Sequence, residues 1–218
     1  MKEKIIIYGI GKFPKLLSIY LQDKFEIVGY TVEKEYLSQN QFLEKPVIAF
    51  EDIEKEYNPK EFSCFVAIGY SYINKLRERI VKEVKAKKYN LVSYVHPSSI
   101  IAKDVEIKEN TFIFENVTIQ PFTKLEENLI IWSNATICHD TIIEKNCFIG
   151  ANSCINGFVK IGQNSFIGAS STIRNNISIG KFNIIGAGCT ILENTENNKV
   201  YKSKNPILLD INSEKINI

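Results

Sequence analysis

An aliphatic residue stands at every sixth position from Ile101 to Ile191, without interruption. Fifteen of these sixteen residues are isoleucine, and the other is Leu125. A period of six matches neither an α-helix, whose side chains repeat every 3.6 residues, nor a long strand, whose side chains alternate. It is typical of a parallel β-helix, in which each hexad supplies one short strand and one corner. The second half of the chain is therefore predicted to be a β-helix.

The same period predicts how the side chains stack. If three hexads form one coil, each aliphatic residue of the repeat, here called a rung residue, lies against the rung one coil further on, at a strand separation of about 4.8 Å. The residues two positions before the rungs are mostly small or β-branched, and we expect them to let the chain turn each corner. Glycines that follow rungs in the later coils are expected where the backbone approaches something closely: Gly150, Gly162, Gly168, Gly180 and Gly186.

The first half of the chain has a different pattern. Residues 4–10 predict a buried strand, and a turn at residues 11–14 leads into an apolar-periodic segment at 16–21. Further strands are predicted at 26–31, 64–68 and 91–95, and a basic amphipathic helix at about 73–88. Alternating strands and helices indicate a small Rossmann-like parallel sheet. We therefore expect an α/β domain over residues 1–95 and a β-helix with a short C-terminal tail over 96–218.

Ligands of parallel sheets bind at the carboxyl ends of the strands. Gly9, Gly11 and Gly69 lie at such ends, with Lys12 and Tyr70 beside them, so these five residues are the candidates for binding a phosphate or ribose. The third glycine of the dinucleotide fingerprint is missing, and NAD is not expected. An equally good interpretation is that the glycines only make a tight strand-to-helix turn.

Composition excludes several classes of protein. Lys and Arg number 27 against 25 Asp and Glu, which argues against a nucleic-acid binder, since many phosphates require a concentrated excess of basic residues. No apolar stretch approaches the roughly 20 residues that span a bilayer, and the N-terminus lacks a signal-peptide core. A cytoplasmic protein without a membrane segment is expected. With His96 and His139 as the only histidines and five cysteines that lack CxxC spacing, no metal site is expected.

Several short motifs accompany this organisation: Ile-Ile-Ile-Tyr-Gly at 5–9, Ala-Ile-Gly at 67–69, His-Pro-Ser at 96–98, Ile-Cys-His-Asp at 137–140, Val-Lys-Ile-Gly at 159–162 and Phe-Ile-Gly-Ala at 166–169. These motifs, and the order of a small α/β domain followed by hexads, resemble the left-handed β-helix acyltransferases. The resemblance covers nearly the whole chain. Within these acyltransferases the chain resembles the group of sialic acid O-acetyltransferases and nucleotide-amino-sugar N-acetyltransferases. The resemblance implies a left-handed coil and a homotrimer. It also implies acetyl-CoA between neighbouring β-helices and a nucleotide sugar on the N-terminal domain.

The resemblance implies catalytic roles for His139 and Asp140. His139 matches the general base that takes a proton from the sugar amine or hydroxyl, and Asp140 matches the carboxylate that raises its basicity. This is sound chemistry, because a neutral imidazole accepts a proton and a carboxylate stabilises the resulting cation. Adjacent strand residues point to opposite faces, so the pair can cooperate only if the chain turns a corner there. Without the resemblance, His139 is as well explained as an outward-facing corner residue.

Four further residues match positions around acetyl-CoA. Gly157 matches the position whose N–H receives the thioester carbonyl, a role that needs no side chain. Ala169 and Ala187 match positions that flank the pantetheine arm. Phe148 stands where the family often has a second histidine near the acetyl group, so the sequence departs from the family there.

The leading prediction is an acetyl-CoA-dependent N-acetyltransferase. It would act by direct transfer to the amino group of a UDP- or dTDP-linked amino deoxy sugar, in the synthesis of a bacterial surface glycan. One alternative is O-acetylation of a sugar, as in the sialic acid group. Another is a non-catalytic β-helix that scaffolds a complex, because a β-helix needs no active site to be stable.

Overall fold

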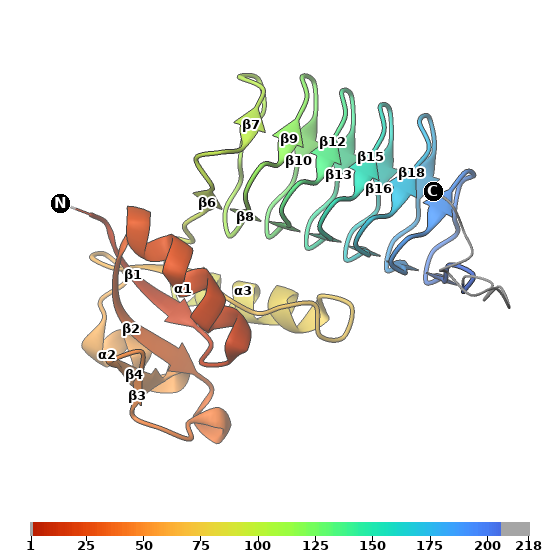
Figure 1. The fold of residues 1–218 in the computed structure, drawn as a ribbon. Coiled ribbons are helices and arrows are strands. Elements are labelled where there is room, and N and C mark those ends of the chain that lie inside the picture. Colours follow the sequence, from red (N-terminus) through yellow and green to blue (C-terminus); the bar gives the residue numbers. More distant parts are fainter. Residues whose placement is uncertain (1, 206–218) are drawn as a thin grey trace, which may run out of the picture.

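The computed structural model describes residues 2–205 and contains two parts (Figure 1). An α/β domain comes first, and a three-sided parallel β-helix follows it. Met1 and residues 206–218 lie outside the described residues, and with them most of the predicted C-terminal tail. The two-part organisation agrees with the change of pattern in the sequence.

The α/β domain is built on a five-stranded sheet with the order β3-β4-β2-β1-β5. Its parallel strands are β1 (Lys4–Tyr8), β2 (Glu26–Val32), β4 (Lys45–Ala49) and β5 (Ser63–Val66). The short β3 (Gln41–Phe42) pairs antiparallel with β4. The structure confirms a small parallel sheet at the predicted segments 4–10, 26–31 and 64–68. Strands β3 and β4 were not predicted, because the segment that contains them has no clear periodicity.

Helices cover both faces of this sheet. Ile5 and Ile7 of β1 pack in one cluster with α1 (Lys12–Lys24). Ile6 and Tyr8 face the other way, toward α2 (Ile53–Glu56) and α3 (Lys75–Ala86). Short 3₁₀ turns, η1 (Lys34–Tyr36) and η2 (Phe50–Asp52), follow β2 and β4. The predicted turn at 11–14 is wrong in one respect: α1 already begins at Lys12, because proline is tolerated in the first turn of a helix.

The predicted strand at 91–95 is divided between the two parts. Leu91 forms an isolated bridge with Cys64 of the α/β sheet. β6 (Tyr94–Val95) instead pairs with β8 (Phe112–Ile113) in the β-helix. Val95 thus occupies a rung position one coil before Ile113, which explains why this segment leaves the first sheet.

Three parallel sheets of two-residue strands form the β-helix. The base sheet contains β6, β8, β11 (Ile130–Ile131), β14 (Phe148–Ile149), β17 (Phe166–Ile167), β20 (Ile184–Ile185) and β22 (Val200–Tyr201). The second sheet contains β7 (Ile100–Ile101), β9 (Thr118–Ile119), β12 (Thr136–Ile137), β15 (Cys154–Ile155), β18 (Thr172–Ile173) and β21 (Thr190–Ile191). The third contains β10 (Lys124–Leu125), β13 (Ile142–Ile143), β16 (Lys160–Ile161) and β19 (Ser178–Ile179).

Stacking of the rungs agrees with the predicted coil of three hexads. Ile131 pairs with Ile149, and Ile149 pairs with Ile167. These three side chains are fully buried and belong to one continuous core inside the coil. Ile107 alone among the predicted rungs lies in no strand. The left-handed sense of the coil stays a prediction.

Corners are made by residues in the left-handed region of φ and ψ, three positions after the rungs. Most are asparagine, which tolerates this region better than other side chains: Asn110, Asn116, Asn128, Asn134, Asn146, Asn152, Asn164 and Asn176. The small residues that were expected to turn the chain follow directly after these corners and point inward; Thr111, Ser153 and Ser171 are buried. That part of the prediction is wrong, because the backbone conformation of the preceding residue makes the turn.

Glycines after the rungs lie against the backbone of the next coil. A Cβ atom on Gly150 would come within 2.6 Å of the Ala169 nitrogen, and one on Gly168 within 2.5 Å of the Ala187 nitrogen. Gly162 and Gly180 are equally close to the following coil. The predicted close approach is therefore confirmed, and its partner is the chain itself.

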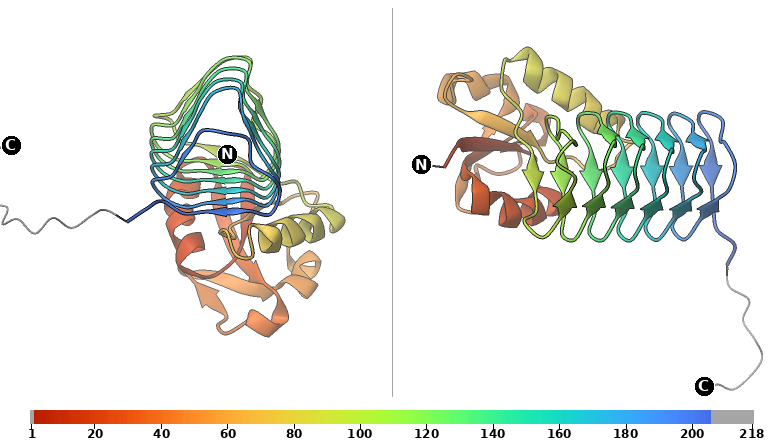
Figure 2. Two further views of the ribbon diagram at one scale, coloured as in Figure 1. Left: turned by 90° about the vertical axis from the view of Figure 1, so that its right-hand side faces the viewer. Right: turned by 90° about the horizontal axis from the view of Figure 1, so that it is seen from above.

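The α/β domain lies against the base sheet of the β-helix (Figure 2), and aromatic side chains on this sheet join the two parts. The ring of Phe114 stacks on Trp132 with centroids 4.3 Å apart, and Phe13 of α1 stacks on Trp132 at 6.2 Å. Tyr20 of α1 donates a hydrogen bond to Glu115 at 2.5 Å. This packing determines which face of the three-sided coil carries the domain.

Candidate active site

His139 and Asp140 form a pair at the corner between β12 of the second sheet and β13 of the third. His139 Nδ1 lies 2.9 Å from Asp140 Oδ2, and Asp140 has a φ of 55°. The turn of the chain at this residue is what brings two consecutive side chains together. The requirement for a corner, stated from sequence, is therefore met.

The His139 side chain is held on several sides and stays half exposed. Its backbone N–H donates to Gln120 Oε1 at 3.0 Å. The Phe158 ring approaches the imidazole edge-on, with centroids 5.2 Å apart. Gly157 lies against the same ring: a Cβ atom there would be 2.9 Å from Nε2 and 2.8 Å from Cε1. Any other residue at 157 would displace the imidazole.

The candidate residues for acetyl-CoA lie on different sides of one chain. Gly157 is buried beside His139, and its backbone N–H donates none of the hydrogen bonds found among residues 2–205. Ala169 and Ala187 are exposed and lie one coil apart, at the corner between the base and second sheets. The structure thus brings Gly157 to His139 but places the two alanines at a different corner.

Phe148 lies on the base sheet beneath the α/β domain. It is 5% exposed, stacks on Phe166 at 5.0 Å and contacts Tyr70 edge-on at 5.1 Å. The side chain packs the two parts of the chain together and is not near His139 of the same chain. Its contact with acetyl-CoA stays a prediction.

The candidate residues of the α/β domain do come together. Gly9, Gly11, Lys12 and Gly69 line a cavity of about 470 Å³ at the carboxyl ends of β1, β2 and β5. Lys12, Gly69 and Tyr70 also line an adjoining cavity of about 320 Å³, which reaches Trp132 and Phe148 of the β-helix. We call the two together the acceptor cavity. The structural interpretation of the glycines also holds for Gly9, whose φ is 122° and where a Cβ atom would be 2.7 Å from the Pro14 ring.

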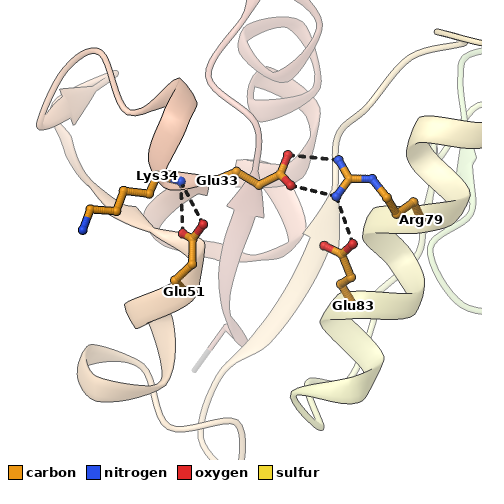
Figure 3. Close-up of polar contacts among 5 residues, drawn as sticks. All are labelled: Glu33, Lys34, Glu51, Arg79 and Glu83. Carbon is orange, nitrogen blue, oxygen red and sulfur yellow. Dashed lines mark hydrogen bonds and ion pairs between the residues drawn. The ribbon is translucent and has the colours of Figure 1, made fainter.

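Sequence reasoning missed an ion-pair network at the edge of the acceptor cavity (Figure 3). Glu33 follows β2 and lines the cavity. Arg79 of α3 holds both of its oxygens, at 2.7 and 3.0 Å, and also contacts Glu83 at 2.9 Å. The Arg79 hydrogen bonds lower the pKa of Glu33 below its ordinary value. Beside this network, the Lys34 N–H donates to both oxygens of Glu51.

Two exposed tyrosines were also missed. Tyr36 and Tyr72 line the same cavity, and these residues are 60% and 80% exposed. The available signal for Glu33 was its position directly after the second strand, where acidic residues of nucleotide sites stand. No comparable sequence signal exists for the tyrosines.

His139 and the acceptor cavity lie on opposite sides of the β-helix. The α/β domain packs on the base sheet (Figure 2). His139 stands instead at the corner between the second and third sheets, which is the corner that does not border the base sheet. No residue that lines the acceptor cavity belongs to the His139 corner. Within one chain, the candidate base therefore lies away from the cavity that the α/β domain forms.

Two other observations concern residues 2–205 only. They contain no cluster of three or more His, Cys, Asp and Glu side chains that could hold a metal ion. None of the helices found in this part of the chain has the length and apolar character to cross a bilayer.

The fold and the site define a parallel β-helix with an N-terminal α/β domain and a histidine–aspartate pair at one corner. Residues 90–201 match the family model of the GMPPB C-terminal domain. Because this match covers more than half of the 218 residues, the chain belongs to that family. A comparison with curated proteins gives no match.

Solved structures share the fold over nearly the whole chain. The acetyltransferase domain of PglB from Neisseria gonorrhoeae, in complex with acetyl coenzyme A, is 20% identical, with a TM-score of 0.79 over 92% of this chain and 96% of that one. PerB from Caulobacter crescentus, in complex with CoA and GDP-perosamine, is 23% identical, with a TM-score of 0.79 over 90% and 92%. WeeI from Acinetobacter baumannii is 18% identical, with a TM-score of 0.74 over 90% and 94%.

Proposed function

We propose that this protein is an acetyl-CoA-dependent N-acetyltransferase that acts on the amino group of a nucleotide-linked amino deoxy sugar. The observation that carries the proposal is the His139–Asp140 pair at a β-helix corner, with Gly157 packed against the imidazole. PglB and PerB, which share the fold, support it, since one is described with acetyl coenzyme A and the other with CoA and GDP-perosamine. A cytoplasmic location and a role in surface-glycan synthesis stay predictions.

The geometry at the corner suits proton abstraction from an amine. Asp140 contacts Nδ1 of His139, so Nδ1 carries the ring proton and Nε2 is free to accept one. Asp140 then stabilises the imidazolium that forms. Acetyl-CoA would supply an activated acetyl thioester. Gly157 lies against the imidazole, and its N–H, which donates no hydrogen bond among residues 2–205, is proposed to donate to the thioester oxygen.

The active site is proposed to be shared between subunits of a homotrimer. The acceptor cavity and His139 lie on opposite sides of one chain, so a sugar bound to one α/β domain can meet only the His139 of another copy. Ala169 and Ala187 lie at a different corner from Gly157, which also suits a pantetheine arm held between two β-helices. A shared site thus accounts for the separation of all these candidate residues.

The nucleotide is proposed to be UDP or dTDP, bound by Gly9, Gly11, Lys12, Gly69 and Tyr70 in the acceptor cavity. PerB, which is described with GDP-perosamine, makes a guanine nucleotide the first alternative to test. O-acetylation of a sugar, as in the sialic acid group, is the second alternative, because the same base can deprotonate a hydroxyl. The scaffold alternative is weaker in one respect only: it gives no reason for the imidazole–carboxylate pair.

The first experiment measures CoA release. The protein is incubated with acetyl-CoA and a panel of UDP-, dTDP- and GDP-linked amino sugars, with free sialic acid as the hydroxyl acceptor. Loss of the base in His139→Ala should lower kcat by about 10²- to 10⁴-fold. His96→Ala is the matched control, because His96 is the other histidine and lies at the junction, hydrogen-bonded to Ser98. Full activity in His139→Ala, or no turnover of any acceptor, would refute the proposal.

A second experiment tests the shared site. Gly69→Tyr should block the acceptor cavity without a clash, because an added Cβ there meets no atom within 4 Å. Unfolded and refolded together, Gly69→Tyr and His139→Ala should form mixed trimers. In an equal mixture, about a quarter of the shared sites combine the intact cavity of a His139→Ala chain with the intact base of a Gly69→Tyr chain. Activity should therefore return. Each variant refolded alone is the control, and a mixture as inactive as both would show that each site lies within one chain.

A further inference from the structure

Arg77 of α3 carries a charge that is buried between the two parts of the chain. Its side chain is fully buried, and each of its hydrogen-bond acceptors is a carbonyl or amide oxygen rather than a carboxylate. Nη1 donates to Gly69 O at 2.8 Å, and Nη2 donates to Asn146 O at 3.1 Å. Burial lowers the pKa of the guanidinium to about 9, which leaves it charged at neutral pH. Burying a charge without a counter-ion is unfavourable, so the guanidinium depends on its hydrogen bonds to oxygens of both parts of the chain.

The acceptors for Arg77 on the β-helix are held in place by an amide ladder. Asn110, Asn128, Asn146 and Asn164 occupy the same corner in successive coils, between the third and base sheets. Each amide donates to the next, at 2.8, 2.8 and 3.2 Å. The ladder ends on the α/β domain: Val66 N–H donates to Asn110, and Asn164 donates to Glu78. Arg77 Nε donates to Asn128 Oδ1 at 3.0 Å.

On its other side, Arg77 contacts a strained loop. This loop, residues 68–74, connects β5 to α3 and is called the acceptor loop below. Tyr72, Ile73 and Asn74 have φ values of 52°, 53° and 62°, a left-handed conformation that is strongly disfavoured for a β-branched residue such as Ile73. Such strain persists only where the surroundings hold it. Asn74 donates to the backbone oxygens of Asn164 and Ser165, both at 3.3 Å, while Arg77 holds Gly69.

The acceptor loop forms one wall of the acceptor cavity. Ile68, Gly69, Ser71 and Tyr72 line its larger part, and Gly69 and Tyr70 line its smaller part. The loop is therefore strained at the place where a ligand would bind, and it is held by the hydrogen bonds that Asn74 donates to the β-helix and that Arg77 of α3 donates to Gly69. Its shape is thus coupled to the docking of the two parts.

We propose that Arg77 is a positioning residue that holds the acceptor loop in the conformation that binds the nucleotide sugar. This inference rests on the proposed function for the identity of the ligand. Arg77 does not touch the reacting atoms; it acts through the Gly69 carbonyl and the asparagine ladder. Its loss should weaken binding of the acceptor and leave binding of acetyl-CoA unchanged.

The test compares Arg77→Met and Arg77→Lys with Lys85→Met in the full chain. Lys85 lies on the same helix and also pairs with the β-helix, through Glu109, but it is exposed and does not contact the acceptor loop. Hydrogen exchange of residues 68–74 should become about tenfold faster in Arg77→Met, because charge-assisted hydrogen bonds to the loop are lost. The acceptor KM should rise by about tenfold, with the acetyl-CoA KM unchanged. Lys85→Met should change none of these values.

Several outcomes would overturn the inference. Unchanged exchange in the acceptor loop of Arg77→Met, or an equal increase in Lys85→Met, excludes a positioning role. If Arg77→Met does not fold, Arg77→Lys decides. The lysine ammonium keeps the charge but cannot reach both Gly69 and the asparagine ladder. Hydrogen exchange in the acceptor loop of Arg77→Lys must then be faster than in α3. If the unmodified protein turns over no acceptor, the proposed function fails, while the exchange comparison still decides the role of Arg77.

Discussion

The β-helix and the α/β domain bury comparable apolar side chains, yet they specify their neighbours in different ways. In the β-helix, Ile149 lies between Ile131 and Ile167, so every contact is set by one fixed spacing. In the α/β sheet, Ile5 pairs with both Ile27 and Ser63, and no spacing relates these contacts. Periodic packing is therefore readable from sequence but has little room to adjust. Irregular packing is harder to predict but can relax.

The largest effect is expected for Ile149→Ala. This rung is fully buried between two others whose backbones are fixed by the hydrogen bonds of the base sheet, so the cavity left by the substitution cannot collapse. The free energy of unfolding should therefore fall by about 4 kcal/mol. Ile7→Ala, equally buried, should lose about 2 to 3 kcal/mol because α1 can move toward it. Chemical denaturation measures both. Equal losses would contradict the difference in adaptability, and Ile142→Ala, which faces outward on β13, is the control.

A smaller effect is expected for Gly168→Ala. The new Cβ would be 2.5 Å from the backbone of the next coil, so stability should fall by about 2 kcal/mol. Gly29→Ala in the α/β domain is the matched comparison: its Cβ would press on the Tyr57 hydroxyl, which is the end of a side chain rather than backbone. Its loss should be about half as large. Thermal unfolding of the pair tests this, and a reversed order would show that the coils can separate.

The smallest effect is expected for Glu33→Gln and depends on pH. The Arg79 hydrogen bonds lower the pKa of Glu33 in the folded protein below its ordinary value of 4.5. Its contribution is therefore present above pH 4.5 and is lost as the pH falls through the lowered pKa. At neutral pH the variant should be less stable by about 1 kcal/mol or less, because the pair is partly exposed.

Urea denaturation between pH 7 and pH 3 measures this prediction. The two stability curves should converge toward the acid end, where Glu33 is protonated and resembles glutamine. Glu83→Gln removes the more exposed partner of Arg79 and is the control. Parallel curves over the whole range would mean that the Arg79 contact does not govern the titration of Glu33.

Most of the β-helix was predictable because its contacts repeat. The rungs, the three sheets and the stacking of one coil on the next all follow from the period of six. The role of Asn128 and the other corner asparagines in turning the chain was missed, although these asparagines recur at the same spacing as the rungs. The hydrophobic pattern does not report the backbone conformation at a corner. The turn was therefore attributed to the small residues that follow the corners.

The candidate site was predictable where it depends on local sequence. His139 and Asp140 are adjacent, and Gly9 and Gly69 end predicted strands, so simple rules place each of them. The relation between these places was not predictable. It depends on which face of the coil packs on α1, and therefore on aromatic residues such as Phe112 and Phe148, whose recurrence one or two coils apart is the signal that was available. The Arg79–Glu33 pair joins segments without any regular spacing and left no such signal.

The coil of three hexads also restricts how the length of this chain can change. Deleting or inserting one whole coil leaves each later residue on its own face and moves it along the axis by about 4.8 Å. Deleting a single hexad would instead rotate every later face by a third of a turn. The aromatic residues would then leave α1, and the asparagine ladder would break. We therefore expect viable length variants of this protein to differ by whole coils.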